Sequence, residues 1–232
     1  EKAYQKSLED FAQLRGASLW YPYLGSGFGK GALVELTDGS VKYDFINGIG
    51  VHVGHGIKPL IETNIDAAIE DTVMQGHLQQ TEASLKLSHL LIEASSMDHC
   101  LLTTSGAMAC ENAIKMALQK QAPKQRILAF ENCFMGRTMS LAQVTDKPHL
   151  RDGLPLNLPV DYLPFYDYKD PEGSLKKTIK HAERIIKRYP NSHAVMCMEL
   201  VQGEGGFYPG TPDFFKGLIQ FLKSHNIAIL VD

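Results

Sequence analysis

The sequence predicts an α/β protein with a mainly parallel sheet, helices on both of its faces, and a small N-terminal hairpin region. After Pro59, short apolar runs alternate with segments of helical length, a pattern typical of parallel strands joined by helices. Before that point, the runs LVELT and VKYDF flank Asp38-Gly39, which is a strong signal for a β-hairpin. We therefore expect an N-terminal segment with the hairpin over residues 1–57 and a larger α/β domain over residues 58–232.

The elements follow in order along the chain. A short helix is predicted at residues 1–14, followed by the hairpin, and helical periodicity covers residues 59–74 and 82–94. Strands are predicted at residues 100–104, 126–130, 194–200 and 227–231, with a short edge strand at 161–165 because Pro164 limits its pairing. Further helices are predicted at residues 106–121, 174–189 and 212–226.

The glycine-rich run GSGFGKG at residues 25–31 is expected to be a flexible loop. It is not a Walker A motif, because Leu24 stands where that motif has its first glycine and Gly31 where it needs Ser or Thr. No strand precedes it, so it is not a dinucleotide fingerprint either.

Composition excludes several functional classes. The chain has 232 residues, 44% of them hydrophobic, so it can bury a sizeable core. Its net charge is −3 and no long basic run occurs; Lys176, Lys177 and Lys180 are interpreted as the solvated face of a helix, so no nucleic-acid partner is expected. No apolar run reaches the roughly 18 residues of a membrane span, and no secretory signal is visible. We expect no membrane partner and a cytoplasmic location.

Cysteine and histidine spacing gives no metal or disulfide signal. The four cysteines lack CxxC spacing and lie in apolar stretches, so they are interpreted as buried free thiols in a reducing compartment. His52 and His55 in HVGH have no third ligand nearby and are interpreted as turn histidines rather than metal ligands.

Polar residues follow the predicted strands at their carboxyl ends, which is where open parallel sheets bind ligands. One sheet edge should therefore collect an anion-binding turn, an aromatic ring, a cation and three carboxylates. Taken alone, the sequence of this turn is more typical of an ordinary serine N-cap than of an anion site. Taken alone, Glu204 is interpreted as a solvated carboxylate in a loop. The residues are Ser105, Gly106 and Ala107; Phe134 and Arg137; Glu199, Gln202 and Glu204; and Asp232.

Four stretches occur in order along most of the chain: KGALVELTDGSVKYDFINGIGVHVGHGIKPLI, TTSGAMACENAIKMALQK, FENCFMGRTMSLAQVTDKP and MELVQGEGGFYPGTPDFFKGLIQFLKSHNIAILVD. Together they resemble the class III pyridoxal-phosphate-dependent aminotransferases of fold type I. That family includes acetylornithine, ornithine, 4-aminobutyrate and other ω-amino acid aminotransferases.

The resemblance implies a cofactor, pyridoxal 5′-phosphate, and residues that would hold it. Ser105, Gly106 and Ala107 would bind the phosphate through backbone N–H groups and a hydroxyl. Phe134 would stack on the pyridine ring, and Asp232 would pair with the pyridine nitrogen and keep it protonated. Asp232 is accordingly expected among the catalytic residues.

The resemblance also implies further site residues and partners. Glu199 would lie by the edge of the cofactor ring, as a second catalytic residue. Arg137 would bind a substrate carboxylate, Glu204 would modulate an arginine in the pocket, and Tyr21 or Trp20 would contact substrate. The partners implied are an amino donor, which is an amino acid or an ω-amine, a 2-oxo acid acceptor, and a second copy of the chain in a homodimer.

The sequence departs from the family pattern in a few places. Met135 follows the stacking ring where the family commonly has His or another aromatic, and Leu200 stands where Pro is usual. In the helix after the phosphate turn, Met108 and Cys110 replace the more usual Glu and Asn. These departures concern substrate range more than cofactor binding.

The family's Schiff-base lysine comes after the aspartate, and no residue follows Asp232. We therefore expect residues 58–232 to be a cofactor-binding large domain truncated before that lysine, within the N-terminal part of a longer chain. Other functions stay open here: an aminomutase or decarboxylase with the same cofactor, or a non-catalytic binding protein on this scaffold. The sequence does not name the amino donor.

Overall fold

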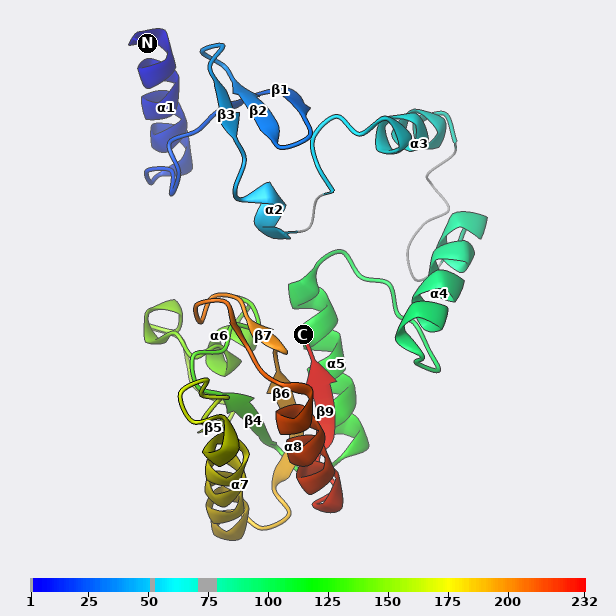
Figure 1. The fold of residues 1–232 in the computed structure, drawn as a ribbon, viewed down its shortest axis with the longest axis vertical. Coiled ribbons are helices and arrows are strands. Elements are labelled where there is room, and N and C mark those ends of the chain that lie inside the picture. Colours follow the sequence, from blue (N-terminus) through cyan, green and yellow to red (C-terminus); the bar gives the residue numbers. More distant parts are fainter. Residues whose placement is uncertain (1, 51–52, 71–78) are drawn as a thin grey trace. The chain divides into compact units, whose positions relative to one another are not determined.

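The structure is a computed structural model that describes residues 2–50, 53–70 and 79–232 (Figure 1). The chain forms two compact units, Glu1–Thr81 and Glu82–Asp232. The expected domain boundary after residue 57 stays a prediction. His52 and the last part of the predicted helix at residues 59–74 lie outside the described residues.

The first unit contains a three-stranded antiparallel sheet in the order β1-β2-β3. Its elements are α1 (Lys2–Arg15), β1 (Gly25–Lys30), β2 (Leu33–Leu36), β3 (Val41–Tyr43), α2 (Asn47–Gly50) and α3 (Lys58–Ala68). The predicted hairpin is confirmed: Gly39 has a φ of +81°, and the Ser40 N–H donates to Asp38 Oδ1 at 2.9 Å. Glycine fits this turn because it adopts a positive φ without steric cost.

The expectation of a flexible loop at residues 25–31 was wrong, because this run forms strand β1. Backbone pairing needs no side chain, and Gly29 pairs with Val34 of β2. A Cβ on Gly29 would lie 2.7 Å from the Cβ of His55, so the glycine lets that segment come close. His55 forms an isolated bridge with Gly31, and its Nε2 lies 2.7 Å from Asp44 Oδ2.

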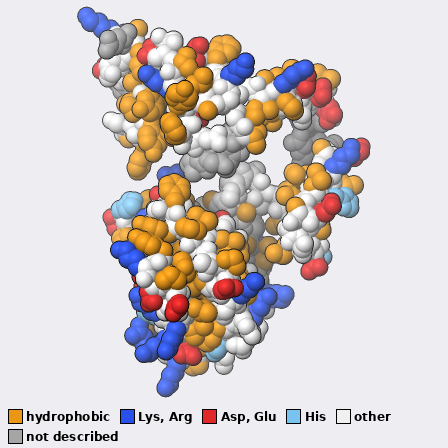
Figure 2. All heavy atoms as spheres, in the orientation of Figure 1, with side chains coloured by type: hydrophobic (Ala, Val, Ile, Leu, Met, Phe, Trp, Pro, Cys, Tyr) orange, Lys and Arg blue, Asp and Glu red, His pale blue; other side chains and the backbone are white. Residues whose placement is uncertain are grey.

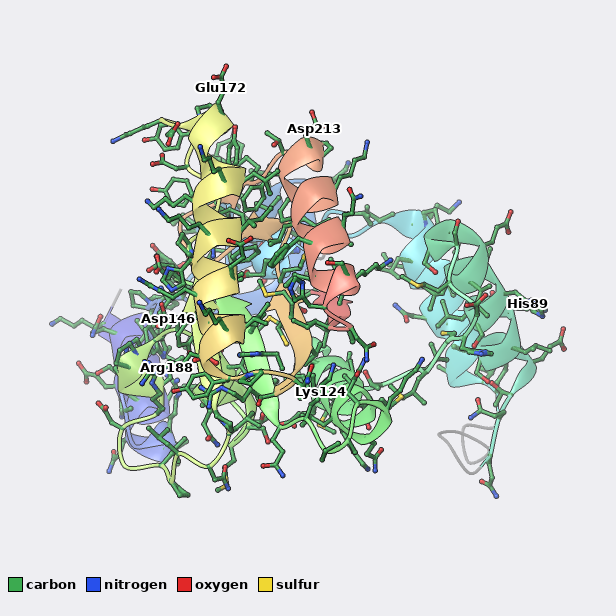
Figure 3. The ribbon with its side chains drawn as sticks, turned by 90° about the horizontal axis from the view of Figure 1, so that it is seen from below. His89, Lys124, Asp146, Glu172, Arg188 and Asp213 are labelled. Atoms are coloured by element: carbon green, nitrogen blue, oxygen red, sulfur yellow. The ribbon has the colours of Figure 1, made fainter. Side chains whose placement is uncertain are left out.

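The second unit is built on a parallel sheet in the order β5-β4-β6-β9, which confirms the predicted fold class. Its strands are β4 (Arg126–Phe130), β5 (Val160–Leu163), β6 (His193–Met198) and β9 (Ala228–Val231), with β5 at the expected edge position. Helices α7 (Pro171–Arg188) and α8 (Pro212–Ser224) lie side by side over one face, and α5 (Gly106–Lys120) covers the other (Figures 1 and 3). The smaller elements are α4 (Glu82–Ser95), α6 (Leu141–Val144), a 3-10 turn at Pro148–Leu150, β7 (Val201–Gln202) and β8 (Tyr208–Pro209).

The ends of α7 and α8 follow from their sequences. Asp170 and Thr211 cap the two helices by accepting backbone N–H groups, and a proline begins each first turn. Glu172 and Asp213 stand at the amino ends, where the helix dipole favours negative charge, and Arg188 at the opposite end of α7 (Figure 3). The lysines of α7 are exposed, as expected for a solvated face, and Figure 2 shows Lys and Arg side chains gathered over the region that α7 occupies in Figure 1.

The core lies between the sheet and its helices. Strands β4 and β6 are almost wholly buried, which explains their unbroken apolar sequences. Phe130 of β4 packs edge-on against Phe165, with ring centroids 4.9 Å apart, and Phe214 of α8 lies 6.0 Å from both rings. Such contacts add to the burial of the rings and fix α8 on the sheet.

A charged cluster joins three strands near their amino ends. Arg126 donates two hydrogen bonds of 2.8 Å to Asp161, and His193 Nε2 lies 2.8 Å from the same carboxylate. Burial pushes the pKa of Asp161 upward, but the hydrogen bonds from Arg126 and His193 outweigh it and hold that pKa below its ordinary value. Burial lowers the pKa of His193, with Asp161 opposing this shift. The cluster ties β4, β5 and β6 together at the edge opposite their carboxyl ends.

The strand predicted at residues 100–104 was wrong. These residues are irregular, Leu101 is half exposed, and no strand in the described part of the chain pairs with them. A strand forms only against a partner, and the apolar composition that suggested one cannot supply it. Of the cysteines, Cys110, Cys133 and Cys197 are buried and Cys100 is half-buried, and all four are free.

The described residues contain neither a membrane-spanning helix nor a cluster of metal ligands. Among the described helices, none combines the length and the apolarity that crossing a membrane requires. Within the same residues, no group of three or more His, Cys, Asp or Glu side chains could hold a metal ion.

Candidate active site

The carboxyl ends of β4, β6 and β9 meet at one edge of the second unit. In the β6–β9 ladder, Met198 pairs with Val231, so Glu199 and Asp232 follow these strands side by side. The Asp232 N–H donates to the Met198 carbonyl at 2.9 Å and extends the pairing by one residue. The amino end of α5 and strand β7 lie at the same edge (Figure 1). Glu199 and Asp232 therefore lie together at this edge, as the rule for the carboxyl ends of parallel strands leads one to expect.

The first turn of α5 presents two free N–H groups. Ser105 caps the helix with an extended backbone, and its hydroxyl accepts the Met108 N–H at 3.2 Å. The N–H groups of Gly106 and Ala107 have no acceptor in the described part of the chain. A Cβ on Gly106 would meet nothing within 4 Å, so the space beside the turn is open. The turn is an ordinary N-cap and can also bind an anion at its open side.

The loop after β4 is held at both sides of Phe134. The Phe134 N–H donates to Glu199 Oε2 at 3.0 Å, and the Met135 N–H donates to the Thr145 hydroxyl at 2.9 Å. The Phe134 ring is half-buried, whereas Met135 is only 2% exposed and belongs to the core. Met135 therefore fills the interior, and the departure from the family pattern at this position changes packing rather than the surface of the site.

Gly136 lets this loop touch the first turn of α5. Its φ is +129°, and a Cβ there would lie 2.7 Å from Leu141 Cδ1 and 3.3 Å from the Cβ of Ala107. The Thr138 hydroxyl also donates to the Glu111 carboxylate of α5. The adjacent Arg137 is exposed, and its guanidinium makes no hydrogen bond or ion pair with any described residue. The loop is thus fixed, while its cation stays available.

Glu199 joins two loops. It is 7% exposed, its Oε2 accepts the Phe134 N–H, and its Oε1 accepts the Gly203 N–H at 3.1 Å. Burial raises the pKa of Glu199, and the negative charges of Asp232 and Glu204 add to this, while the two N–H groups oppose it. Both carboxylate oxygens are occupied, so Glu199 fixes the loop of Phe134 against the turn that follows β7.

Asp232 is bound by a single side-chain hydrogen bond. Cys110, buried on α5, donates its thiol to Asp232 Oδ1 at 3.3 Å. No other hydrogen bond or ion pair reaches the Asp232 carboxylate from the residues that the structure describes. Burial, followed by the charge of Asp232, raises the pKa of the Cys110 thiol to about 12, so the thiol stays protonated near neutral pH.

Two predicted residues stand apart from this arrangement. Glu204 is exposed after β7, where its backbone carbonyl accepts the Lys147 Nζ at 3.3 Å. Tyr21 lies in the first unit and is exposed, so its contact with substrate stays a prediction.

Sequence reasoning missed Cys110 and Gly136 as parts of the site. Cys110 follows Gly106 by one helical turn, so this spacing could have placed both on one face of α5.

The comparisons with known proteins agree with this geometry. The family model Aminotransferase class-III matches residues 27–232. Acetylornithine aminotransferase of Methanocaldococcus jannaschii is 32% identical over 211 residues, covering 88% of this chain and 49% of that protein. The 2-aminoadipate transaminase of Pseudomonas putida is 32% identical over 212 residues, covering 88% of this chain and 50% of that protein. The chain therefore spans about half the length of the curated relatives it matches.

Solved structures share the fold. An amine transaminase from an uncultivated Pseudomonas species, in its PLP-bound form, matches with a TM-score of 0.81 and 21% identity, covering 90% of this chain and 51% of that one. Ornithine aminotransferase from Toxoplasma gondii matches with a TM-score of 0.78 and 23% identity, covering 100% of this chain and 55% of that one. Pyridoxal phosphate is the cofactor of this family. With a family model over most of its length and a parallel sheet of the matching architecture, the chain belongs to the class-III aminotransferases.

Proposed function

We propose that the protein to which this chain belongs is a pyridoxal-phosphate-dependent aminotransferase that transfers an amino group from an amino acid or ω-amine to a 2-oxo acid. One observation carries the proposal. A single sheet edge combines two free N–H groups, an aromatic ring and a carboxylate with an unoccupied oxygen, on Gly106, Ala107, Phe134 and Asp232. These groups match the phosphate, the ring and the nitrogen of the cofactor.

The residues present fit the cofactor in charge and in space. The positive end of the α5 dipole and the two free N–H groups suit a phosphate, and the open space at Gly106 leaves room for it. The Asp232 carboxylate, which no cation among the described residues neutralises, suits a protonated pyridine nitrogen. When bound, pyridoxal phosphate supplies an electron sink for the substrate carbon.

The other residues of the site orient the cofactor or bind substrate. Phe134 stacks on the cofactor ring, and Glu199 fixes the loop that carries Phe134 through the N–H bond described above. The free guanidinium of Arg137 binds a substrate carboxylate in bidentate fashion. Glu204 modulates an arginine of the pocket, and Tyr21 contacts substrate. The Schiff-base lysine that the resemblance places after Asp232 stays a prediction.

A homodimer and a cytoplasmic location complete the proposal. Helices α3 and α4 each have no buried residue, although each carries several apolar side chains. On α4, Leu85 is 57% and Leu90 is 63% exposed. Apolar faces of this kind are typical of surfaces that a subunit covers. A molar mass of two chains for the full-length protein in solution supports this, and a monomer contradicts it.

The test uses the full-length protein loaded with pyridoxal phosphate. Amino donors, including N-acetylornithine, ornithine and ω-amines, are offered with 2-oxoglutarate, and formation of glutamate is measured. We expect transfer from at least one donor and loss of that transfer in Asp232→Ala at unchanged folding by circular dichroism. Cofactor binding without transfer to any acceptor, or full transfer by Asp232→Ala, refutes the proposal.

A further inference from the structure

Asp232 is connected to the phosphate-binding turn through one residue, Cys110. Cys110 is 4% exposed, and its thiol donates to Asp232 Oδ1 at 3.3 Å, which is the one hydrogen bond that the Asp232 side chain makes within the described residues. The backbone of Asp232 is fixed separately, by its N–H bond to the Met198 carbonyl. Within the described residues, the thiol is therefore the one hydrogen-bond donor placed to orient the carboxylate about its own side-chain bonds.

The position of Cys110 places two groups of the proposed cofactor site on helix α5: the free N–H groups of its first turn and the thiol that contacts Asp232. It follows Gly106 by one turn of α5, so the helix that presents the free N–H groups also presents the thiol. The helix in turn is held by the Thr138–Glu111 hydrogen bond and by the close contact between Gly136 and Ala107. A shift of α5 would therefore move the free N–H groups and the Cys110 thiol together.

A thiol is well suited to hold this carboxylate because it donates a hydrogen bond without neutralising the negative charge of the carboxylate. A lysine or arginine at the same place would pair with the carboxylate and compete with a cationic ligand. Burial keeps the thiol protonated, since it raises the pKa of Cys110 to about 12. The negative charge of Asp232 therefore stays available at Oδ2.

We propose that Cys110 is a positioning residue for Asp232, whose Oδ1 it holds so that Oδ2 is free for the pyridine nitrogen of the cofactor. The proposal rests on the proposed function. Loss of the donor in Cys110→Ala weakens binding of pyridoxal phosphate about fivefold, the size expected for a weak hydrogen bond to a charged group. Cys110→Ser, which creates a similar void but keeps a donor, restores most of the affinity.

The first experiment needs no cofactor. The infrared S–H stretching band of Cys110 is identified in the full-length apoprotein by its absence from Cys110→Ala. We expect the band to move to higher frequency in Asp232→Ala, because the thiol loses its acceptor. Cys197→Ala is the matched control, since it removes a buried thiol of β6 that has no bond to Asp232, and it leaves the Cys110 band in place. An unmoved band in Asp232→Ala overturns the contact.

The second experiment titrates the same variants with pyridoxal phosphate and records their thermal unfolding without it. Positioning predicts that Cys110→Ala binds more weakly than Cys110→Ser at similar unfolding temperatures, and that Cys197→Ala binds normally. Equal affinities for the two Cys110 variants overturn the positioning role. Failure of the proposed function looks different: the unmodified protein would not bind pyridoxal phosphate at all, while the shift of the S–H band would still support the contact itself.

Discussion

Gly106→Ala adds one methyl group at the first residue of α5, where the proposed phosphate site and the fold make opposite demands. The new Cβ would meet no protein atom within 4 Å, and the backbone at Gly106 is not in the left-handed region. Alanine is also a better helix former than glycine, by up to about 1 kcal/mol in a helix interior. The apoprotein should therefore keep its stability or gain slightly.

Cofactor affinity, unlike apoprotein stability, should decrease in this variant. The free N–H groups of Gly106 and Ala107 border the open space that the methyl group enters. A phosphate pushed away from these groups loses one or two hydrogen bonds to a charged ligand, each worth about 1.5–3 kcal/mol. Taking about 3 kcal/mol for the sum, the dissociation constant of pyridoxal phosphate should rise roughly 100-fold.

The assay compares two measurements on the full-length protein: thermal unfolding of the apoprotein and titration with pyridoxal phosphate. Met116→Ala is the control, because Met116 is half exposed farther along the same helix and should change neither cofactor affinity nor the amino end of α5. Normal cofactor affinity in Gly106→Ala would show that the phosphate binds elsewhere. A large loss of apoprotein stability would show that the space at Gly106 is not open.

Three further changes test the surroundings of the site. Gly136→Ala should lower the free energy of unfolding by about 3 kcal/mol, because the alanine would have to adopt a positive φ and its Cβ would clash with Leu141. Gly153→Ala should lower it by only about 1 kcal/mol, because Gly153 has a φ of +77° but open space around it. Equal losses for the two variants in thermal or chemical unfolding would contradict this. Burial lowers the pKa of His193 below its ordinary 6.5, and Asp161 opposes this shift. As the pH falls, the unfolded chain therefore takes up the proton before the folded chain does, and the free energy of unfolding decreases below about pH 6.5. His193→Gln should flatten that part of a denaturant profile measured against pH, and an unchanged slope refutes the assignment. Arg137→Ala should raise the KM for a carboxylate-bearing substrate about tenfold or more at unchanged unfolding temperature, because its guanidinium has no partner among the described residues; an unchanged KM argues against this role.

Local patterns were sufficient for much of the fold. Helices α7 and α8 combine strong amphipathicity with a capping residue and a proline at the amino end, so their positions follow from neighbouring residues alone. The unbroken apolar runs of β4 and β6 likewise predict central strands, because both faces of such strands are covered.

Pairing between distant segments could not be predicted in the same way. Residues 100–104 have a strand-like composition and no partner among the described strands, whereas β1 has a loop-like composition and pairs with β2. In both cases the outcome depends on a neighbouring backbone rather than on the segment's own side chains. The same limit applies to the site. The rule for strand ends placed Glu199 and Asp232 at one edge, but the thiol that contacts Asp232 comes from a helix 122 residues away in the sequence.

The two carboxylates at this edge differ in what their surroundings leave for a ligand. Glu199 and Asp232 end adjacent strands, and their like charges repel, which adds to the burial that raises the pKa of Glu199. Glu199 has both oxygens occupied by backbone N–H groups, so a cation placed beside it would gain little additional bonding. Asp232 is exposed and accepts only one neutral thiol among the described residues. A protonated ring nitrogen at this edge would relieve the repulsion and find a free oxygen only at Asp232, which is why the charge partner of the cofactor should be Asp232, and Glu199 the residue that fixes the loops around it.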